Sequence, residues 1–262
     1  MTTTAWSITQ SGRYEPFDLQ VARNQISWHK FNYQYGSNSN IGTGLTTIWA
    51  AGGTYAYPAA ATVVTISSNN ANDTSSGTGA QTVLIQGLDA DFNQISETVS
   101  MNGLTPVSTT LSYLRINDMH VATAGNLGGA AGTLYAGVGV VTSGIPATIY
   151  SLMPVDYNSS NQALWTVPAG YTGYLTSCSW TSANTTANIV VTGSIFIRPY
   201  GGVFLAQSNC KMEAGNNYDR HFDIPIMIPE KSDIEMRASS STAGSQVTGE
   251  FHVIYIKNDA NG

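Results

Sequence analysis

The segment nearest to an active-site pattern is Asp219-Arg-His221-Phe-Asp223. Side chains alternate between the two faces of a β-strand, so Asp219, His221 and Asp223 would share one face. Two carboxylates beside an imidazole can orient a general base or bind a metal ion. No second histidine stands at a ligand spacing, however. The segment therefore better fits a cluster of ion pairs at the surface or at an interface, with Arg220 as the cation.

A second acidic segment, Asp89-Ala-Asp91-Phe-Asn93, is similar to the start of a calcium-binding loop. Such a loop needs glycine at its sixth position and lies between two helices. Here the sixth position is Gln94, and the flanking residues alternate as strands do. Aspartate and asparagine are frequent in tight turns because they hydrogen-bond to nearby backbone groups. The sequence therefore predicts a β-turn at this place.

The chain contains no nucleophile elbow, phosphate-binding loop, dinucleotide fingerprint or zinc motif. We therefore predict no catalytic residue, no cofactor and no bound metal, and we expect a protein that is not an enzyme. One alternative keeps an enzymatic role, namely a polysaccharide depolymerase with a carboxylate pair in a groove. Neutralising Asp219 and Asp223 while measuring sugar release would test that alternative.

Aromatic residues are numerous, with fourteen Tyr and five Trp. Exposed aromatic faces can bind sugars, and Trp165, Trp180, Tyr171 and Tyr174 are candidates for that role. Aromatic residues are also enriched in ordinary strands, so strand and core positions are expected for most of them. A carbohydrate-binding module is thus a further alternative.

The charge balance excludes whole classes of partner. Only 10% of the 262 residues are charged, and ten Lys and Arg against sixteen Asp and Glu give a net charge of −6. No Lys or Arg occurs between Lys30 and Arg115, or between Arg115 and Arg198. A nucleic-acid binder needs a basic stripe to displace counterions from phosphates, and anionic lipids attract the same kind of patch. We therefore expect neither nucleic acid nor a membrane as partner.

The two cysteines and the start of the chain bear on the compartment. Cys178 and Cys210 are expected to be buried free thiols, since nothing indicates an oxidising compartment, although a bridge between them stays open. The residues after Met1 form no basic region followed by an apolar one, so we expect no secretory signal. No apolar window of about 18 residues predicts a transmembrane helix.

Short alternating segments predict an all-β protein. At least eleven runs of apolar and polar residues alternate with period two and end at Gly, Asn, Ser or Pro, which is the pattern of strands. They are Thr62–Ser67, Gln81–Gln86, Gln94–Ser100, Leu111–Ile116, Gly132–Ala136, Gln162–Val167, Tyr171–Trp180, Ile189–Arg198, Gly202–Gln207, Asp233–Ala238 and Thr248–Lys257. We predict two antiparallel domains of the β-sandwich or jelly-roll type, over residues 51–144 and 145–262.

The first 50 residues differ from the rest, because their aromatic and charged residues do not alternate strictly. We predict an extended N-terminal arm over residues 1–50, although a segment packed on its own domain is an equal alternative. Aromatic residues and arginine are what interface hot spots use. The hypothetical assembly interface consists of Tyr14, Phe17, Leu19, Val21, Arg23, Trp28 and Phe31.

The low charge also bears on the sheet edges. Edge strands of soluble monomers are commonly protected by Lys or Pro. Long strand-rich stretches of this chain lack both residue types. The edges must therefore pair within sheets or be covered by other subunits, which favours an oligomer.

Several segments resemble a family of virion structural proteins encoded by tailed phages of marine and cyanobacterial hosts. The resemblance covers most of residues 13–240 and rests on turns and strands. The segments are Phe17-Asp-Leu-Gln-Val-Ala-Arg23, Tyr55-Ala-Tyr-Pro, Gln86-Gly-Leu-Asp-Ala-Asp-Phe-Asn, Ile95-Ser-Glu-Thr-Val, Thr166-Val-Pro-Ala-Gly-Tyr-Thr-Gly-Tyr-Leu175 and Ile228-Pro-Glu-Lys-Ser-Asp-Ile-Glu-Met-Arg-Ala238.

The resemblance implies a virion protein that is assembled in the host cytoplasm. Within that class we favour a capsid decoration or cement protein attached through its N-terminal arm. The expected partners are other virion proteins, namely the major capsid protein or tail proteins, and further copies of the chain, with a trimer favoured. The alternative is a tail, baseplate or fibre component that contributes to adsorption on host-surface glycans.

Overall fold

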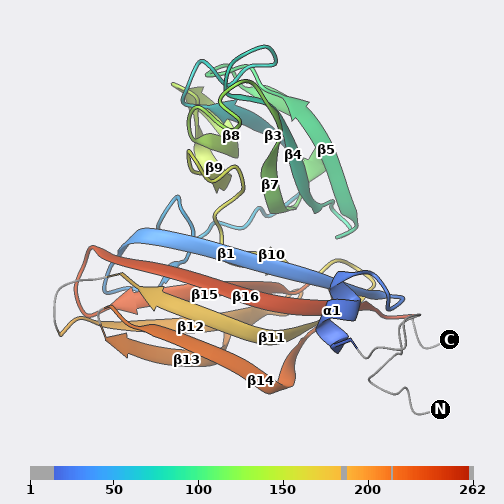
Figure 1. Cartoon of the computed structure of the whole chain (residues 1–262), viewed down its shortest axis with the longest axis vertical. Coiled ribbons are helices and arrows are strands. Elements are labelled where there is room, and N and C mark those ends of the chain that lie inside the picture. The colour runs from blue at the N-terminus through green and yellow to red at the C-terminus, as the bar shows by residue number, and fades with distance from the viewer. Residues whose placement is uncertain (1–14, 184–187, 214, 260–262) are drawn as a thin grey trace.

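The computed structural model describes residues 15–183, 188–213 and 215–259. Within these ranges the chain forms one short helix, α1 (Phe17–Ala22), and sixteen strands. Four antiparallel sheets build two sandwich-like domains, one above the other in Figure 1. The all-β prediction is confirmed. Among the described residues, no helix is both apolar enough and long enough to cross a bilayer.

The lower domain is an eight-stranded jelly roll. One sheet has the order β1 (His29–Ile41), β16 (Ser245–Lys257), β11 (Tyr171–Ser182) and β14 (Asn217–Ile228). The facing sheet has the order β10 (Leu164–Thr166), β15 (Asp233–Ser240), β12 (Val190–Arg198) and β13 (Leu205–Glu213), and the short β2 (Thr46–Thr47) pairs with β15. This strand order, with the first strand beside the last, is that of a double Greek key.

Alternation explains why these segments form a sandwich. Along β11, Leu175, Cys178 and Trp180 are buried, while the serines between and beside them are partly exposed. Phe251 and Val253 of β16 face the same interior. The two sheets bury these apolar side chains against each other, which is the main favourable contribution to folding.

The upper domain is a second sandwich, inserted between β2 and β10. Its sheets have the orders β6 (Val107–Tyr113), β3 (Thr62–Ser68), β8 (Leu134–Thr142), β9 (Ile145–Met153), and β5 (Gln94–Ser100), β4 (Ala80–Leu88), β7 (Arg115–Ala124). Its core is separate from that of the jelly roll and contains Ile66, Ile85, Tyr113 and Met119. We call it the inserted domain.

The structure corrects the predicted N-terminal boundary. Residues 1–14 lie outside the described residues, but β1 pairs with β16 over most of its length, so residues 29–41 belong to the jelly roll. Alternation fails there because the usual pattern is reversed. Gln34 and Asn38 are buried and hydrogen-bonded, whereas Phe31 and Tyr33 are exposed.

The boundary predicted after residue 144 also moves. Ser143 and Gly144 both have positive φ and form the two-residue turn of a hairpin that joins β8 to β9. An ideal Cβ on Gly144 would lie 1.8 Å from the carbonyl oxygen of Ser68, so only glycine fits. The first sandwich therefore continues to Met153. The prediction placed the boundary too early because it interpreted a hairpin turn as the end of the sheet.

Candidate assembly surface and interdomain groove

The predicted interface residues divide into exposed and covered ones. Val21 is buried, and Phe17 is half-buried with its ring 5.6 Å from that of His29 in an edge-to-face contact. Arg23 is exposed and forms an ion pair with Glu15. The exposed apolar members are Leu19, Trp28 and Phe31, and Tyr14 lies outside the described residues.

Three exposed aromatic side chains, one directly before β1 and two within it, form what we call the aromatic strip. Trp28, Phe31 and Tyr33 are 55%, 46% and 43% exposed. His252 of the neighbouring β16 lies 5.7 Å from the ring of Phe31 and 5.0 Å from that of Tyr33. In the sheet, β1 is an edge strand with one neighbour. Phe31 and Tyr33 therefore form an exposed aromatic pair around His252, and Trp28 lies at the start of the same edge strand.

Polar contacts hold the strip in place. The Tyr33 hydroxyl donates a hydrogen bond to Glu250, and burial together with this carboxylate raises the pKa of Tyr33 to about 12. The Lys257 ammonium group lies 5.0 Å above the ring of Trp28. The aromatic rings are thus fixed before any partner binds, which lowers the entropy lost on binding.

The second half of β1 contacts the inserted domain. The Gln34 side chain donates to the backbone oxygen of Asn117 at 3.1 Å, and the hydroxyls of Tyr35 and Ser159 are 2.7 Å apart. Figure 1 shows β1 as the strand of the front sheet that runs closest to the upper domain. One strand therefore serves both the domain junction and the exposed strip.

At the opposite end of the two sheets, the edge strands are β13 and β14. Their exposed large apolar residues are Leu205, Met227 and Ile224, and Ile224 lies in the register shift of β14. These two edge strands are not among the stretches that lack Lys and Pro, because β13 carries Lys211 and β14 carries Pro225. These devices oppose uncontrolled pairing of the strands.

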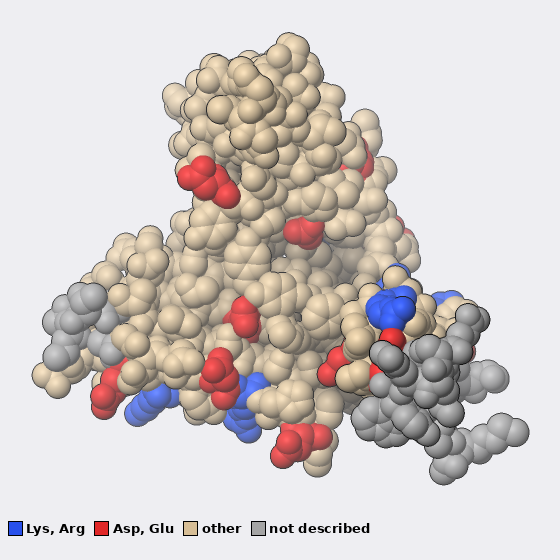
Figure 2. All heavy atoms as spheres, in the orientation of Figure 1, with Lys and Arg blue, Asp and Glu red and all other residues tan. Residues whose placement is uncertain are grey.

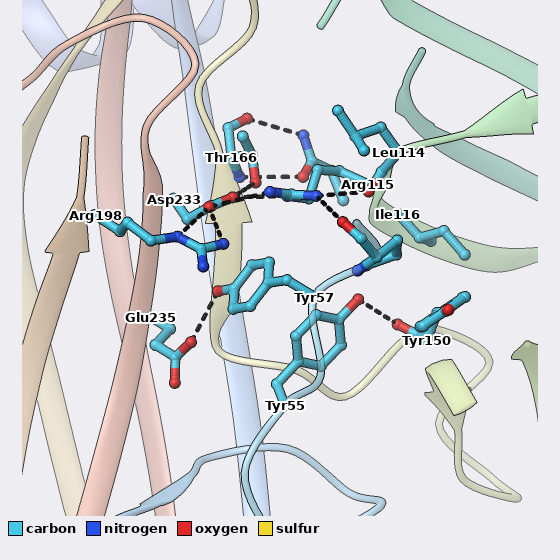
Figure 3. A network of polar contacts seen from close by, with 12 residues as sticks. Tyr55, Tyr57, Leu114, Arg115, Ile116, Tyr150, Thr166, Arg198, Asp233 and Glu235 are labelled. Atoms are coloured by element: carbon cyan, nitrogen blue, oxygen red, sulfur yellow. Dashed lines mark hydrogen bonds and ion pairs between the residues drawn. The ribbon is translucent and has the colours of Figure 1, made fainter. Parts of the chain in front are cut away.

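The two domains are joined by a polar network around Asp233 of β15, which is buried (Figure 3). Its carboxylate accepts from Arg115 Nε at 2.8 Å, from Arg198 Nε at 2.9 Å and from Thr166 Oγ1 at 2.6 Å. Arg115 begins β7 of the inserted domain, whereas the other groups belong to the jelly roll. One carboxylate thus connects both domains by charge-assisted hydrogen bonds.

Tyr57 completes the network. Its hydroxyl donates to Glu235 at 2.8 Å, and its ring lies 4.9 Å from the Arg115 guanidinium and 4.4 Å from that of Arg198. Burial, followed by the nearby carboxylates of Glu235 and Asp233, raises the pKa of Tyr57 well above its usual range. The tyrosine stays protonated and acts as a hydrogen-bond donor, so the arrangement holds the domains together and offers no general base.

A groove of about 670 Å³ opens beside this network. We call it the interdomain groove. The residues that line it are Tyr57, Pro58, Ala59, Ala60, Ala61, Ala90, Phe92, Leu114, Arg115, Arg198, Pro199, Tyr200, Gly201, Gly202, Lys231 and Asp233. Three of these residues are cations and one is an acid. In Figure 2 the blue atoms lie on or next to the jelly roll, and the inserted domain shows few charges.

The segment that most resembled an active site lies on the exposed outer face of β14. Strand register places Ser177 of β11 between His221 and His252, and Ser179 between Asp219 and Glu250. Sequence reasoning missed His252 and Glu250, because only the register brings β16 beside β11. Across the described ranges, no three His, Cys, Asp or Glu side chains are grouped so that they could hold a metal ion.

The other candidates from the sequence, namely the acidic turn, the aromatic residues and the cysteines, have structural roles. Asp89 accepts hydrogen bonds from the backbone of Asp91 and Asn93, which confirms the predicted turn. Trp165 and Trp180 are buried in the jelly-roll core and cannot stack on a sugar. Tyr171 and Tyr174 are partly buried, and the two cysteines are buried free thiols, as predicted.

Comparisons with known proteins found only weak structural similarity. No protein-family model and no curated protein matched the chain. A structure of infectious bursal disease virus, Gx strain, aligns at 11% identity over 89% of this chain and 73% of the other, with a TM-score of 0.25. The VP2 subviral particle of that virus aligns at 10% identity over 90% and 73%, with a TM-score of 0.23. Scores this low assign neither a family nor a function.

Proposed function

We propose that this chain is a non-enzymatic structural protein of a virus particle. The observation that carries the proposal is the reversed pattern of β1, in which amides face inward and Phe31 and Tyr33 face outward beside Trp28. Exposed aromatic groups on a rigid strand edge are suited to a protein interface. Jelly rolls are common in viral capsid proteins, and this supports the proposal by analogy of fold alone.

Within the particle, we favour capsid decoration. The surface that would attach the protein consists of the aromatic strip with Leu19 and Arg23, and its partner would be the major capsid protein. The predicted self-association into trimers would use the edge strands β13 and β14, where Ile224 and Met227 are exposed. Repeated attachment to a symmetric lattice suits a surface with few charges, because desolvating it is inexpensive.

The alternative is a tail, baseplate or fibre component that contributes to adsorption on host-surface glycans. The interdomain groove, with its cations and aromatic rings, supports that alternative. Copy number separates the two roles. A number that matches the capsid lattice means decoration, whereas a number that matches the tail symmetry means a tail component.

Point substitutions in the strip test the attachment, because deleting the whole segment would remove β1 from the jelly roll. The variant Trp28→Ser/Phe31→Ser/Tyr33→Ser should no longer co-sediment with particles that lack the protein. A matched control, Leu104→Ser/Leu127→Ser/Val140→Ser, removes as many exposed apolar groups from the inserted domain, away from both proposed interfaces, and should still bind. Full occupancy by the strip variant, with unchanged circular dichroism, would disprove the attachment surface.

A further inference from the structure

We propose that the interdomain groove binds an acidic saccharide, whose carboxylate or sulfate group is held by Lys231 and whose ring packs on Tyr200. The site differs from the attachment surface, and it does not depend on where the protein lies in a particle. Four features of the groove support it: an unpaired cation, two turn residues with positive φ, an exposed tyrosine ring, and walls that contain small residues.

Lys231 is the unpaired cation. Its side chain is half-buried, and within the described part of the chain no carboxylate lies within ion-pair distance of its ammonium group. The neighbouring Asp233 is already shared by Arg115 and Arg198. Three cations and one acid line the groove, so two positive charges are uncompensated in a protein of net charge −6. An anion would supply the missing partner.

Backbone strain marks the same residue. Lys231 has a φ of +59° and Phe92, on the other wall, has a φ of +67°. This left-handed region favours glycine or asparagine, and side chains that occupy it at a cost cluster at functional sites. The Lys231 N–H donates to the Val167 oxygen at 2.9 Å, which fixes the turn.

The aromatic groups supply a surface for an apolar ring face. Tyr200 is 70% exposed, and its ring packs edge-to-face on Phe92 at 5.4 Å, so its orientation is fixed across the domain junction. The Lys231 ammonium group lies 5.8 Å from the Tyr200 ring and 6.0 Å from the Phe92 ring. A pyranose has an apolar C–H face and a polar rim, so a fixed ring beside a cation suits an acidic sugar.

The walls favour a saccharide over an acidic peptide. They include turns and connecting segments with small residues at Ala59, Ala60, Gly201 and Gly202. Peptide sites that recognise acidic motifs use clusters of arginine. Here both arginines, Arg115 and Arg198, are already paired with Asp233, which leaves a single free cation. The volume of about 670 Å³ lies within the usual range for sites that enclose a small ligand.

Calorimetric titration of the full chain with trigalacturonate, and with neutral maltotriose for comparison, tests the proposal. Trigalacturonate should bind and maltotriose should not. The variants Lys231→Gly and Tyr200→Ala should each weaken binding by about tenfold or more, the effect of losing one charge-assisted contact or one stacking surface. Lys231→Gly should also keep or raise the melting temperature, since it relieves the strained φ, which separates lost binding from lost folding.

The matched control is Lys30→Ala, which removes a lysine that also lies over two aromatic rings, those of Tyr171 and Tyr255, and that does not line the groove. It should leave the affinity unchanged. Equal binding by wild type and Lys231→Gly would overturn the site, and so would equal binding of maltotriose. Tighter binding of a hexaglutamate peptide than of trigalacturonate would also overturn it, because the groove would then recognise a protein partner.

Discussion

The two domains each bury one aspartate, and they satisfy it in different ways. In the inserted domain, the carboxylate of Asp73 is fully buried and accepts from Ser68 Oγ and from the backbone N–H groups of Ala80, Ala131 and Gly132. All of these donors are neutral. In the jelly roll, the carboxylate of Asp233 is bound mainly by two arginines.

The difference reflects what each aspartate connects. Asp73 fixes a loop to strands of its own domain, and short backbone dipoles reach it there. Asp233 connects two separate cores, and the long side chain of Arg115 spans the junction. Arg115 is the only cation of residues 55–160. In a chain with so few charges, buried ion pairs are concentrated where two folded units meet.

The largest effect is expected from Asp233→Ala. It leaves Arg115 and Arg198 at the junction without a counter-charge, which should destabilise the protein by about 3–5 kcal/mol. Urea denaturation measures the loss. The triple variant Arg115→Met/Arg198→Met/Asp233→Leu should recover much of it, because a buried ion pair can often be replaced by apolar groups. A loss under about 1 kcal/mol from the single variant contradicts the connecting role.

A smaller and more local effect is expected from Asp73→Asn. The amide keeps the shape but turns two hydrogens toward donors, so about 2–3 kcal/mol should be lost. Hydrogen exchange should accelerate at the N–H groups of Ala80, Ala131 and Gly132 and stay unchanged in β11. The exposed Asp91→Asn is the control and should have no measurable effect. Uniform acceleration in both domains would mean that Asp73 is not a local anchor.

The turn of the inserted domain gives a comparison within one domain. Gly144→Ala combines a positive φ with a clash against the Ser68 oxygen, and we expect a loss of about 2 kcal/mol. Gly128→Ala has a similar φ of +74° but nothing within 4 Å, so about 1 kcal/mol is expected. Thermal unfolding of both variants separates the steric contribution from the conformational one. Equal losses would show that the close approach at Gly144 relaxes easily.

The smallest effect concerns pH and the jelly-roll core. Burial raises the pKa of Cys178 to about 12 and raises that of Cys210 as well. The unfolded thiols ionise near their ordinary pKa, while the folded ones stay protonated. The free energy of unfolding is therefore at its full value below the ordinary pKa of a thiol and falls as the pH rises above it. A loss of about 1 kcal/mol is expected by pH 9. The variant Cys178→Ala/Cys210→Ala should lack this part of the pH dependence in urea titrations.

Strand composition allowed the all-β fold to be predicted, because β11 and β4 alternate in the ordinary way. It did not reveal β1, whose inward residues Gln34 and Asn38 are polar and find partners only in the folded chain. The Asp233 network could not be predicted either, since Arg115 lies 118 residues away in the sequence. The same holds for His252, which meets Ser177 only through strand register.

The insertion point has a consequence for how this architecture can vary. The chain leaves the jelly roll after Ile48 and returns at Ala163, and the N–H of Ala163 donates to the oxygen of Ile48 at 2.8 Å. Trp49 and Gln162 also form a β-bridge. The two chain segments that lead into and out of the inserted domain thus lie side by side and are paired like the two strands of a hairpin. The pairing of the two ends belongs to the jelly roll itself, so the position at which the chain leaves and returns does not depend on the number of residues inserted between them.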